Sequence, residues 1–412
     1  MMQYGLIGEH LGYSYSKDIH GQLSPCTYEL RELSREGLDA FMQEAPFLGI
    51  NVTIPYKEAV LPYLSWISPE ARAIGAVNTI VKRDGRLLGY NTDYTGLKAL
   101  AAKAGIAFRG RRVLILGAGG AAKCAHALAL DEGASSVTHA VRNPHEPGQL
   151  RLDSLGPDCD CEILINCTPV GVNPREEDCP TDIRQFPRLV GVLDLIYNPL
   201  RTNLVLDAQE AGMPAEGGLY MLVAQAVAAR ALFDATDLDF RETTDSVYQN
   251  QLKAKRNWVL TGMPSSGKST LGRLLAEKSG RRFVDTDDLI PAKAGKAIPQ
   301  IFAEDGEPRF RAWESAVIRE LSRETGLVIA TGGGAILDWQ NVRRLRRNGS
   351  IFYLQRDLDR LEATADRPLS SERSALEALF ARRKEAYESA AEITVDNNGS
   401  LADSLHQIES LI

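Results

Sequence analysis

One ten-residue stretch, Thr261-Gly-Met-Pro-Ser-Ser-Gly-Lys-Ser-Thr270, restricts the fold of this chain more than any other feature. Its spacing of Gly262, four residues and then Gly267-Lys268-Ser269 is that of a phosphate-binding loop. An apolar run at 258–260 precedes it and a leucine-rich helical pattern at 271–278 follows, so a chance Gly/Ser-rich turn is the weaker explanation. Backbone N–H groups of such a loop surround nucleotide phosphates, with the lysine on the outer phosphates and the last hydroxyl on Mg²⁺. The predicted nucleotide site comprises Gly262, Ser265, Ser266, Gly267, Lys268, Ser269 and Thr270, with Ser269 as a metal ligand.

The rest of the chain is too long for one domain, because 412 residues correspond to roughly two or three. Its 44% hydrophobic and 25% charged residues are typical of a soluble globular protein. A net charge of −7 argues against a general nucleic-acid or membrane surface, and no apolar run approaches the ~18 residues that span a bilayer. The N-terminus lacks a signal-peptide pattern, and the six cysteines form no Cys-x-x-Cys pair. We therefore expect a cytoplasmic protein with free thiols that binds small molecules; a homodimer stays open as its assembly state.

The first hundred residues alternate short strands and helices, and four polar clusters fall at strand ends. Taken singly, each cluster has an ordinary explanation, because Ser and Asn cap helices and turns and a lone lysine is usually solvated. Together they describe a pocket rich in hydroxyl and amide groups, suited to a small polyhydroxylated acid. The clusters are residues 13–16, 51–57, 75–79 and 89–93.

Three of these blocks, Asn51-Val-Thr-Ile-Pro-Tyr-Lys57, Gly75-Ala-Val-Asn-Thr79 and Asn91-Thr-Asp93-Tyr-Thr-Gly96, resemble the signature blocks of the shikimate dehydrogenases. The resemblance covers residues 1 to about 235. It implies that Lys57 and Asp93 are the catalytic pair, and a lysine held by an aspartate suits the general acid that ketone reduction needs. It also implies that the substrate is bound by Ser14 and Ser16 through its carboxylate and by Thr53, Asn78 and Gln225 through its ring hydroxyls. Tyr13 and Lys17 depart from the family's His-Ser-x-Ser-Pro, which leaves the exact acid open.

A dinucleotide fingerprint, Gly117-Ala-Gly119-Gly120-Ala-Ala122, follows an apolar strand and precedes a helix. The next strand ends at Arg142-Asn143 rather than at an acidic residue, and a guanidinium suits a 2′-phosphate, so NADP is favoured over NAD. Two further strands bring Thr168 over the cofactor and Tyr197 to the substrate, and a return helix carries Gln225. The predicted NADP-binding residues are Gly117, Gly119, Gly120, Ala121, Arg142, Asn143 and Thr168.

After the phosphate-binding loop, a second strand ends in Asp285-Thr286-Asp287, where acids can bind Mg²⁺ or a substrate hydroxyl. A third strand runs into the triple glycine Gly332-Gly-Gly334 without the acid of a regular ATPase or GTPase. These blocks and Phe310-Arg311 resemble the shikimate kinases from about residue 256 to 412.

That second resemblance implies a role for each matched residue. Asp287 would hold the ring hydroxyls and activate the attacking oxygen, Asp285 would support magnesium, and Arg383 would hold the substrate carboxylate. Arginines suit these tasks because they pair with carboxylate and phosphate bidentately. The remaining matches are Arg311 and the backbone of Gly333 at the substrate, Arg360 on the adenine side, and Arg367 before Pro368 as a catalytic lid arginine.

The fold class that follows is α/β throughout, in three predicted domains. These are a substrate domain at 1–97 completed by 218–240, a Rossmann NADP domain at 98–217 and, after a linker at 241–255, a P-loop domain at 256–412 like the nucleoside monophosphate kinases. The resemblances imply a bifunctional enzyme that reduces 3-dehydroshikimate to shikimate with NADPH and then phosphorylates shikimate with ATP. The alternatives are a quinate/shikimate dehydrogenase of relaxed specificity fused to the same kinase, and a non-catalytic sensor of shikimate-type ligands.

Overall fold

The computed structural model describes residues 2–12, 14–361 and 373–412, so the predicted Tyr13, Arg367 and Pro368 lie outside the described residues. The chain divides into two compact units, Met1–Gln251 and Leu252–Ile412. None of the helices in the described ranges is long and apolar enough to cross a membrane. Each unit is α/β with sheets that are largely parallel, which confirms the predicted fold class.

The first sheet of unit 1 has six strands in the order β2-β1-β3-β5-β6-β4. Its strands β1, β2 and β3 run parallel, whereas β5 pairs antiparallel with both β3 and β6. The strands are β1 (Met2–Gly8), β2 (Tyr28–Glu32), β3 (Phe47–Val52), β4 (Trp66–Ile67), β5 (Thr79–Arg83) and β6 (Arg86–Tyr90). The helices around them are α1 (Ser16–Leu23), α2 (Arg35–Glu44), α3 (Tyr56–Ala59) and α4 (Pro69–Ile74).

The second sheet of unit 1 is parallel in every pair, in the order β12-β11-β10-β7-β8-β9. With β7 first in sequence, this is the strand order of the doubly wound dinucleotide-binding fold. Its elements are β7 (Arg112–Leu116), α6 (Gly120–Asp131), β8 (Ser136–Val141), β9 (Leu150–Arg151), β10 (Ile163–Asn166), β11 (Gly191–Asp194), α7 (Asn203–Glu210) and β12 (Ala215–Glu216).

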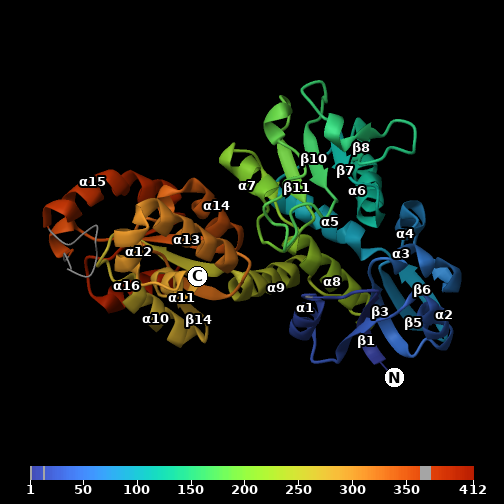
Figure 1. Ribbon diagram of the computed structural model, residues 1–412. Helices are drawn as coiled ribbons and strands as arrows, with labels where there is room; N and C mark the ends of the chain where they lie inside the picture. The colour runs from blue at the N-terminus through green and yellow to red at the C-terminus, as the bar shows by residue number, and fades with distance from the viewer. Residues whose placement is uncertain (1, 13, 362–372) are drawn as a thin grey trace. The chain divides into compact units, whose positions relative to one another are not determined.

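Two helices, α5 (Thr92–Ala104) and α8 (Leu219–Asp234), pack against each other between the two sheets (Figure 1). They approach closely at Gly96, where an added Cβ would lie 2.7 Å from the carbonyl oxygen of Met221. Phe233, near the end of α8, is buried against Gly49 of β3 and stacks on Tyr4 of β1. The apolar side chains of α8 therefore belong to the buried core of unit 1.

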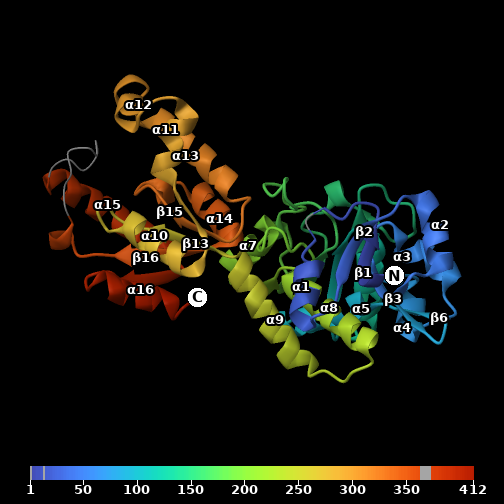
Figure 2. The same ribbon diagram turned by 90° about the horizontal axis from the view of Figure 1, so that it is seen from below.

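Unit 2 is built on a five-stranded parallel sheet in the order β14-β15-β13-β16-β17. In Figure 2, α11, α12 and the start of α13 stand away from this sheet. The strands are β13 (Asn257–Thr261), β14 (Arg282–Asp285), β15 (Leu327–Ala330), β16 (Gly349–Gln355) and β17 (Ile393–Asp396). The helices are α10 (Lys268–Ser279), α11 (Thr286–Ala294), α12 (Ile298–Glu304), α13 (Gly306–Leu321), α14 (Trp339–Asn348), α15 (Arg373–Ala390) and α16 (Leu401–Glu409).

The segment 241–255, predicted as a linker, instead forms most of helix α9 (Phe240–Lys255). Thr244, Val247, Tyr248 and Gln251 are buried along one face of this helix. Tyr248 packs edge-on against Tyr220 with ring centroids 5.1 Å apart. The apolar stripe has only two strongly hydrophobic members, and its weak periodicity explains why the sequence did not reveal the helix.

Candidate active sites

A cavity of about 360 Å³ in unit 1 collects the residues predicted to bind and reduce the substrate. It is lined from the first sheet, from the dinucleotide-binding half and from α8, so segments far apart in sequence meet there. The predicted residues that line it are Ser14, Ser16, Thr53, Lys57, Asn78, Asp93, Ala121, Tyr197 and Gln225. Their roles remain predictions.

Lys57 and Asp93 form an ion pair in this cavity, with Lys57 Nζ 2.6 Å from Asp93 Oδ2. Lys57 lies on the short helix α3, and Asp93 lies in the first turn of α5. The side chains are 19% and 13% exposed, so the pair is screened less than a surface salt bridge but still open to a ligand. A cationic donor held in one place by a carboxylate can deliver a proton to a ligand oxygen.

A buried network of amide and hydroxyl groups holds the floor of the cavity. Asn51 accepts a hydrogen bond from the Tyr28 hydroxyl at 2.8 Å and donates through Nδ2 to Thr79 Oγ1 at 3.0 Å. Asn78 Oδ1 accepts from the backbone N–H of Thr92 at 2.7 Å. Asn51 and Thr92 were not predicted site residues, although both stand in the blocks quoted above.

Tyr197 reaches the cavity just after β11, and its ring centroid lies 5.2 Å from that of Tyr15. The strand before it ends at Asp194, a fully buried carboxyl group. Burial raises the pKa of Asp194 to about 7, against the opposing effect of donors from Thr202, Ile196 and Asn166. The Thr202 hydroxyl donates to Asp194 Oδ2 at 2.6 Å, and the other two donate to Oδ1 at 3.1 and 3.0 Å.

The glycine-rich turn 117–120 joins β7 to α6 and fits a dinucleotide. Gly117 has φ +110°, and an added Cβ would lie 3.4 Å from the Cys167 carbonyl oxygen and from Thr168 Cγ2. Gly119 caps α6 without a side-chain hydrogen bond, which leaves the N–H groups of the first turn open to an anion. A Cβ built on Gly120 would lie 3.8 Å from Lys57 Cδ, so this turn lies next to the ion pair of Lys57 and Asp93.

The remaining predicted NADP residues surround the same turn. Thr168 follows β10 and donates through both its backbone N–H and its hydroxyl to Asn166 Oδ1, at 3.0 and 2.7 Å. Arg142 and Asn143 follow β8 directly and are exposed. A guanidinium at this strand end suits a phosphorylated ribose, so the residues present fit NADP.

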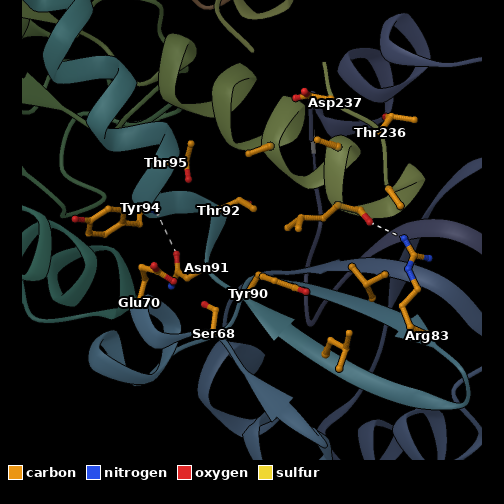
Figure 3. A pocket seen from close by; sticks show the side chains of 16 residues that line it. Ser68, Glu70, Arg83, Tyr90, Asn91, Thr92, Tyr94, Thr95, Thr236 and Asp237 are labelled. Carbon is orange, nitrogen blue, oxygen red and sulfur yellow. Dashed lines mark hydrogen bonds between the residues drawn. The ribbon is translucent and has the colours of Figure 1, made fainter. Parts of the chain in front are cut away.

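A second cavity in unit 1, of about 820 Å³, lies on the other side of the first turn of α5. Figure 3 shows Asn91 accepting from the backbone N–H of Tyr94, at 3.3 Å, and Arg83 donating to the carbonyl of Leu232, at 2.8 Å. Both bonds stabilise helix ends. None of the predicted site residues lines this cavity, so it is separate from the ion pair of Lys57 and Asp93.

The phosphate-binding loop of unit 2 lies between β13 and α10, as predicted. Gly262 has φ +149°, and an added Cβ would lie 2.9 Å from the Leu354 carbonyl oxygen. Gly267 caps α10 in the left-handed conformation without a side-chain bond, and Ser265 is also left-handed with φ +62°. The Ser266 hydroxyl oxygen is buried and has no hydrogen-bond partner within the described parts of the chain. The loop therefore offers N–H and O–H groups to a phosphate.

Lys268 and Ser269 open helix α10 at this loop, with Thr270 exposed after them. Lys268 Nζ donates to the carbonyl oxygens of Gly262 and Met263 at 3.0 and 2.8 Å. The Ser269 hydroxyl donates to Asp285 Oδ2 at 2.6 Å. A hydroxyl and a carboxylate are oxygen ligands of the kind that Mg²⁺ prefers, so Ser269 and Asp285 fit a Mg²⁺ ion that takes its other ligands from water and phosphate.

The residues of unit 2 that were predicted to bind the phosphoryl acceptor lie around the triple glycine at 332–334. A Cβ on Gly332 would lie 2.7 Å from Asp287 Oδ1, and one on Gly334 would lie 2.3 Å from Arg311 Nη1. The Gly333 carbonyl accepts from Arg383 Nη1 at 2.9 Å and from the Tyr387 hydroxyl. Any side chain at 332 or 334 would displace one of these charged groups, which explains the glycines.

Glu314 of α13 belongs to this cluster and was missed by the sequence analysis. Its side chain is 1% exposed, and its Oε2 accepts from Arg311 Nη1 at 2.8 Å. Its Oε1 would lie 2.7 Å from a Cβ on Gly332 and has no hydrogen-bond partner within the described ranges. Burial raises the pKa of Glu314, while Arg311 opposes the rise. Its position three residues after Arg311 was the available signal, since both fall on one helix face.

Arg360, predicted on the adenine side, is exposed at the end of the short 3₁₀ helix Leu358–Arg360 and donates to the carbonyl of Asn398. The neighbouring Asn397 is buried and donates through Nδ2 to the carbonyl of Ser266 in the phosphate-binding loop. Asn397 therefore ties the predicted adenine side to the loop. The predicted lid residue Arg367 lies outside the described residues.

Comparisons with known proteins match the two units of the chain to two different families. The family model of the shikimate dehydrogenase substrate-binding domain matches residues 6–80, and that of shikimate kinase matches residues 264–412. An NADP(+) shikimate dehydrogenase of Clostridium beijerinckii is 35% identical over 267 residues, which cover 99% of that relative and 61% of this chain. One of Chlorobaculum tepidum is 36% identical over 270 residues, covering 91% of the relative and 57% of this chain.

Solved structures give the same result for the N-terminal part. A chorismate mutase/shikimate 5-dehydrogenase fusion protein from Clostridium acetobutylicum matches with a TM-score of 0.56 and 34% identity, covering 61% of this chain and 97% of that one. Shikimate 5-dehydrogenase from Thermus thermophilus, in complex with NADP(H) and shikimate, matches with a TM-score of 0.53 and 30% identity, covering 60% and 99%.

Folds and sites together define a two-part enzyme, an NADP-linked α/β oxidoreductase followed by a P-loop kinase. The chain belongs to the shikimate dehydrogenase family and carries a shikimate kinase domain after it, which confirms both resemblances.

Proposed function

We propose that the chain catalyses two consecutive reactions, the NADPH-dependent reduction of 3-dehydroshikimate to shikimate and the ATP-dependent phosphorylation of shikimate to shikimate 3-phosphate. The observation that carries the proposal is the ion pair of Lys57 and Asp93, 2.6 Å apart in a cavity that the dinucleotide turn adjoins. We also propose that residues 1–97 with 218–240 bind the substrate, 98–217 bind NADP and 256–412 form the kinase, with α9 in place of the linker.

In the reductase cavity, Lys57 gives a proton to the carbonyl oxygen while Asp93 holds the ammonium group in place. NADPH, when bound at the turn 117–120, supplies the hydride that joins the carbonyl carbon. Hydride and proton together convert the ketone to the hydroxyl, so the charges balance. Ser14 and Ser16 hold the carboxylate, and Thr53, Asn78, Tyr197 and Gln225 orient the ring.

In the kinase unit, Asp287 accepts the proton of the attacking hydroxyl, and Arg311 and Arg383 hold the substrate near Gly333. Lys268 and the backbone N–H groups of its loop stabilise the charge on the transferring phosphoryl group. Ser269 and Asp285 would hold Mg²⁺, which supplies charge neutralisation between the phosphates of ATP. Arg360 is proposed on the adenine side, and Arg367, which lies outside the described residues, as the catalytic lid arginine.

A staged assay on the purified full chain tests the proposal. 3-Dehydroshikimate and NADPH are supplied first, then Mg-ATP, while the absorbance of the reduced nicotinamide and the mass of the product are followed. We expect oxidation of NADPH, then formation of shikimate 3-phosphate only after ATP is added. Comparable rates with quinate and NAD would instead favour the relaxed dehydrogenase, and binding of shikimate without turnover at either site would favour the sensor.

A further inference from the structure

A third cavity in unit 1, of about 570 Å³, contains three histidines and lies beside the dinucleotide turn. Ala118 of that turn lines it, together with Ile74 of α4, Lys123 and His126 of α6, His139 of β8 and His145 after β8. Figure 1 shows α6 alongside β7 and β8, the elements that carry the turn and the two inner histidines. None of these histidines has a role in either proposed reaction.

The hydrogen-bond partners of two of the histidines determine which of their ring nitrogens carry a hydrogen. His139 Nδ1 lies 2.9 Å from the carbonyl oxygen of Gly117, and a carbonyl only accepts, so this nitrogen carries the hydrogen. In the neutral ring, His139 Nε2 is then an acceptor, and it lies 2.9 Å from His126 Nδ1, which must donate. The lone pair left over is on His126 Nε2.

This arrangement accepts one proton and no more. A proton added at His126 Nε2 keeps both hydrogen bonds and gives the ring a positive charge and a new donor. A second proton, on His139 Nε2, would set two N–H groups against each other and break the bond. Burial and the neighbouring His139 lower the pKa of His126, so the His126 ring is neutral at neutral pH until an anion offsets both effects.

Besides the histidines, the charged residues that line the cavity are one lysine and one acid. Lys123 lies on the same helix as His126 and pairs with Glu58 of α3 at 2.7 Å. After β8, the cavity is lined by His145 and by one acid, Glu146. The residues that α4 contributes, Ala73 and Ile74, carry no charge.

We propose that the His126–His139 pair is a proton-coupled site for a phosphate monoester, the 2′-phosphate of NADP(H), which enters together with one proton. The site rests on the proposed binding of NADP at the turn 117–120. Two observations support this ligand. The Gly117 carbonyl of that turn accepts a hydrogen bond from His139. Arg142 follows His139 by three residues, at the strand end that binds the adenosine ribose in this fold. The pair thereby makes the preference for NADP over NAD depend on pH, falling as pH rises.

Titration calorimetry of the full chain at pH 7.5, in buffers of different ionisation enthalpy, measures the proton taken up when each oxidised dinucleotide binds. At this pH the 2′-phosphate is already mostly dianionic, so its own titration contributes little. We expect uptake approaching one proton per NADP⁺ and none for NAD⁺. His126→Gln should remove the uptake and weaken NADP⁺ binding about tenfold or more, the usual effect of losing a hydrogen bond to a charged group. NAD⁺ binding should be unchanged in that variant, which also shows that unit 1 is folded.

His406→Gln is the matched control, because His406 is an exposed histidine on α16 of unit 2. Equal proton uptake for NADP⁺ and NAD⁺ in the unaltered chain would overturn the proposal, as would uptake that survives in His126→Gln. Inorganic phosphate is the second probe: if it binds with proton uptake but does not compete with NADP⁺, the site takes free phosphate and the assignment to the cofactor is wrong. Failure of the proposed function differs from all of these, because then neither dinucleotide binds.

Discussion

The two lysines at the proposed catalytic centres are held in different ways. Lys57 Nζ contacts a carboxylate oxygen, whereas Lys268 Nζ donates to the backbone carbonyls of Gly262 and Met263. An ion pair fixes the donor in one position, while carbonyl dipoles can be exchanged for phosphate oxygens of greater charge. The structure therefore fits Lys57 as a fixed proton donor and Lys268 as a group that turns toward its ligand.

Lys57→Ala should lower the dehydrogenase turnover by roughly 10²–10⁴-fold, the usual effect of losing a general acid, and leave kinase turnover unchanged. Lys98→Ala is the control, since Lys98 is a half-exposed lysine on α5 that pairs with Glu132 at 2.7 Å. Steady-state kinetics of both activities check the prediction. Equal losses in Lys57→Ala and Lys98→Ala would remove Lys57 from the mechanism.

Lys268→Ala should show the reverse pattern, with kinase turnover lowered by roughly 10²–10³-fold, as when one preorganised donor to transition-state charge is lost. Lys278, at the far end of the same helix, pairs with Glu409 at 3.0 Å, and Lys278→Ala is the matched control. The same two assays apply. If Lys268→Ala abolished both activities in a folded chain, the two centres would not be independent.

The buried carboxyl of Asp194 makes the stability of unit 1 depend on pH. Its pKa is about 7 in the folded state and ~4 in an unfolded chain, so between these values the folded state binds more protons. Stability therefore falls as pH rises through this window, with a slope approaching about 1.4 kcal/mol per pH unit. Asp194→Asn should remove that slope, measured by urea unfolding between pH 4.5 and 7.5. A slope unchanged by the substitution would mean that another group is responsible.

At the scale of elements, Gly96 allows α5 and α8 to approach each other. Gly96→Ala would place a Cβ 2.7 Å from the Met221 carbonyl and 3.1 Å from Gln225 Cβ. Overpacking of this kind usually costs about 1–3 kcal/mol. We expect the thermal midpoint of unit 1 to fall and the KM for the shikimate-type substrate to rise, because Gln225 must shift. Ala102→Ser, at an exposed position of α5, is the control and should change neither quantity.

Strands were predicted from the sequence where apolar runs precede glycine-rich turns. β7 and β15 end within two residues of Gly117 and Gly332, and β13 contains the apolar run 258–260. The hairpin of β5 and β6 was not predicted, although its turn carries Asp84-Gly85, both with positive φ. Its strands mix polar and apolar residues, which hid the alternation. Helix α9 was missed because its buried face includes Thr244 and Gln251, which read as solvent-exposed.

At the scale of the whole molecule, the division into two units predicts two unfolding transitions in calorimetry. NADP⁺ should raise only the transition of unit 1, and an ATP analogue only that of unit 2. At about 100 times the Kd, a ligand adds about 2.7 kcal/mol, which for units of this size corresponds to roughly 5–10 °C. One transition that moves with either ligand would show that the units unfold together.

Sequence motifs predicted which residues line the candidate sites, but they did not predict several residues that contact those site residues. The predicted substrate-binding and catalytic residues line one cavity, and several of them, such as Thr53 after β3 and Tyr197 after β11, follow the end of a strand. Glu314, Asn397 and the His126–His139 pair escaped prediction. Asn397 is placed by Ser266, a neighbour distant in sequence, and spacing along the chain does not contain that information. Glu314, by contrast, lies three residues after its partner Arg311, a spacing that the sequence does show.

Helix α9 begins in one unit and ends in the other. Tyr248 is buried in unit 1, whereas the carbonyl of Arg256, one residue past the helix, accepts from Arg281 of unit 2 at 2.6 Å. A protease needs an exposed, extended segment, and the residues from 240 to 255 are helical instead. Limited proteolysis of the folded chain should therefore not cut between residues 240 and 255, so the two units should stay covalently joined through this helix.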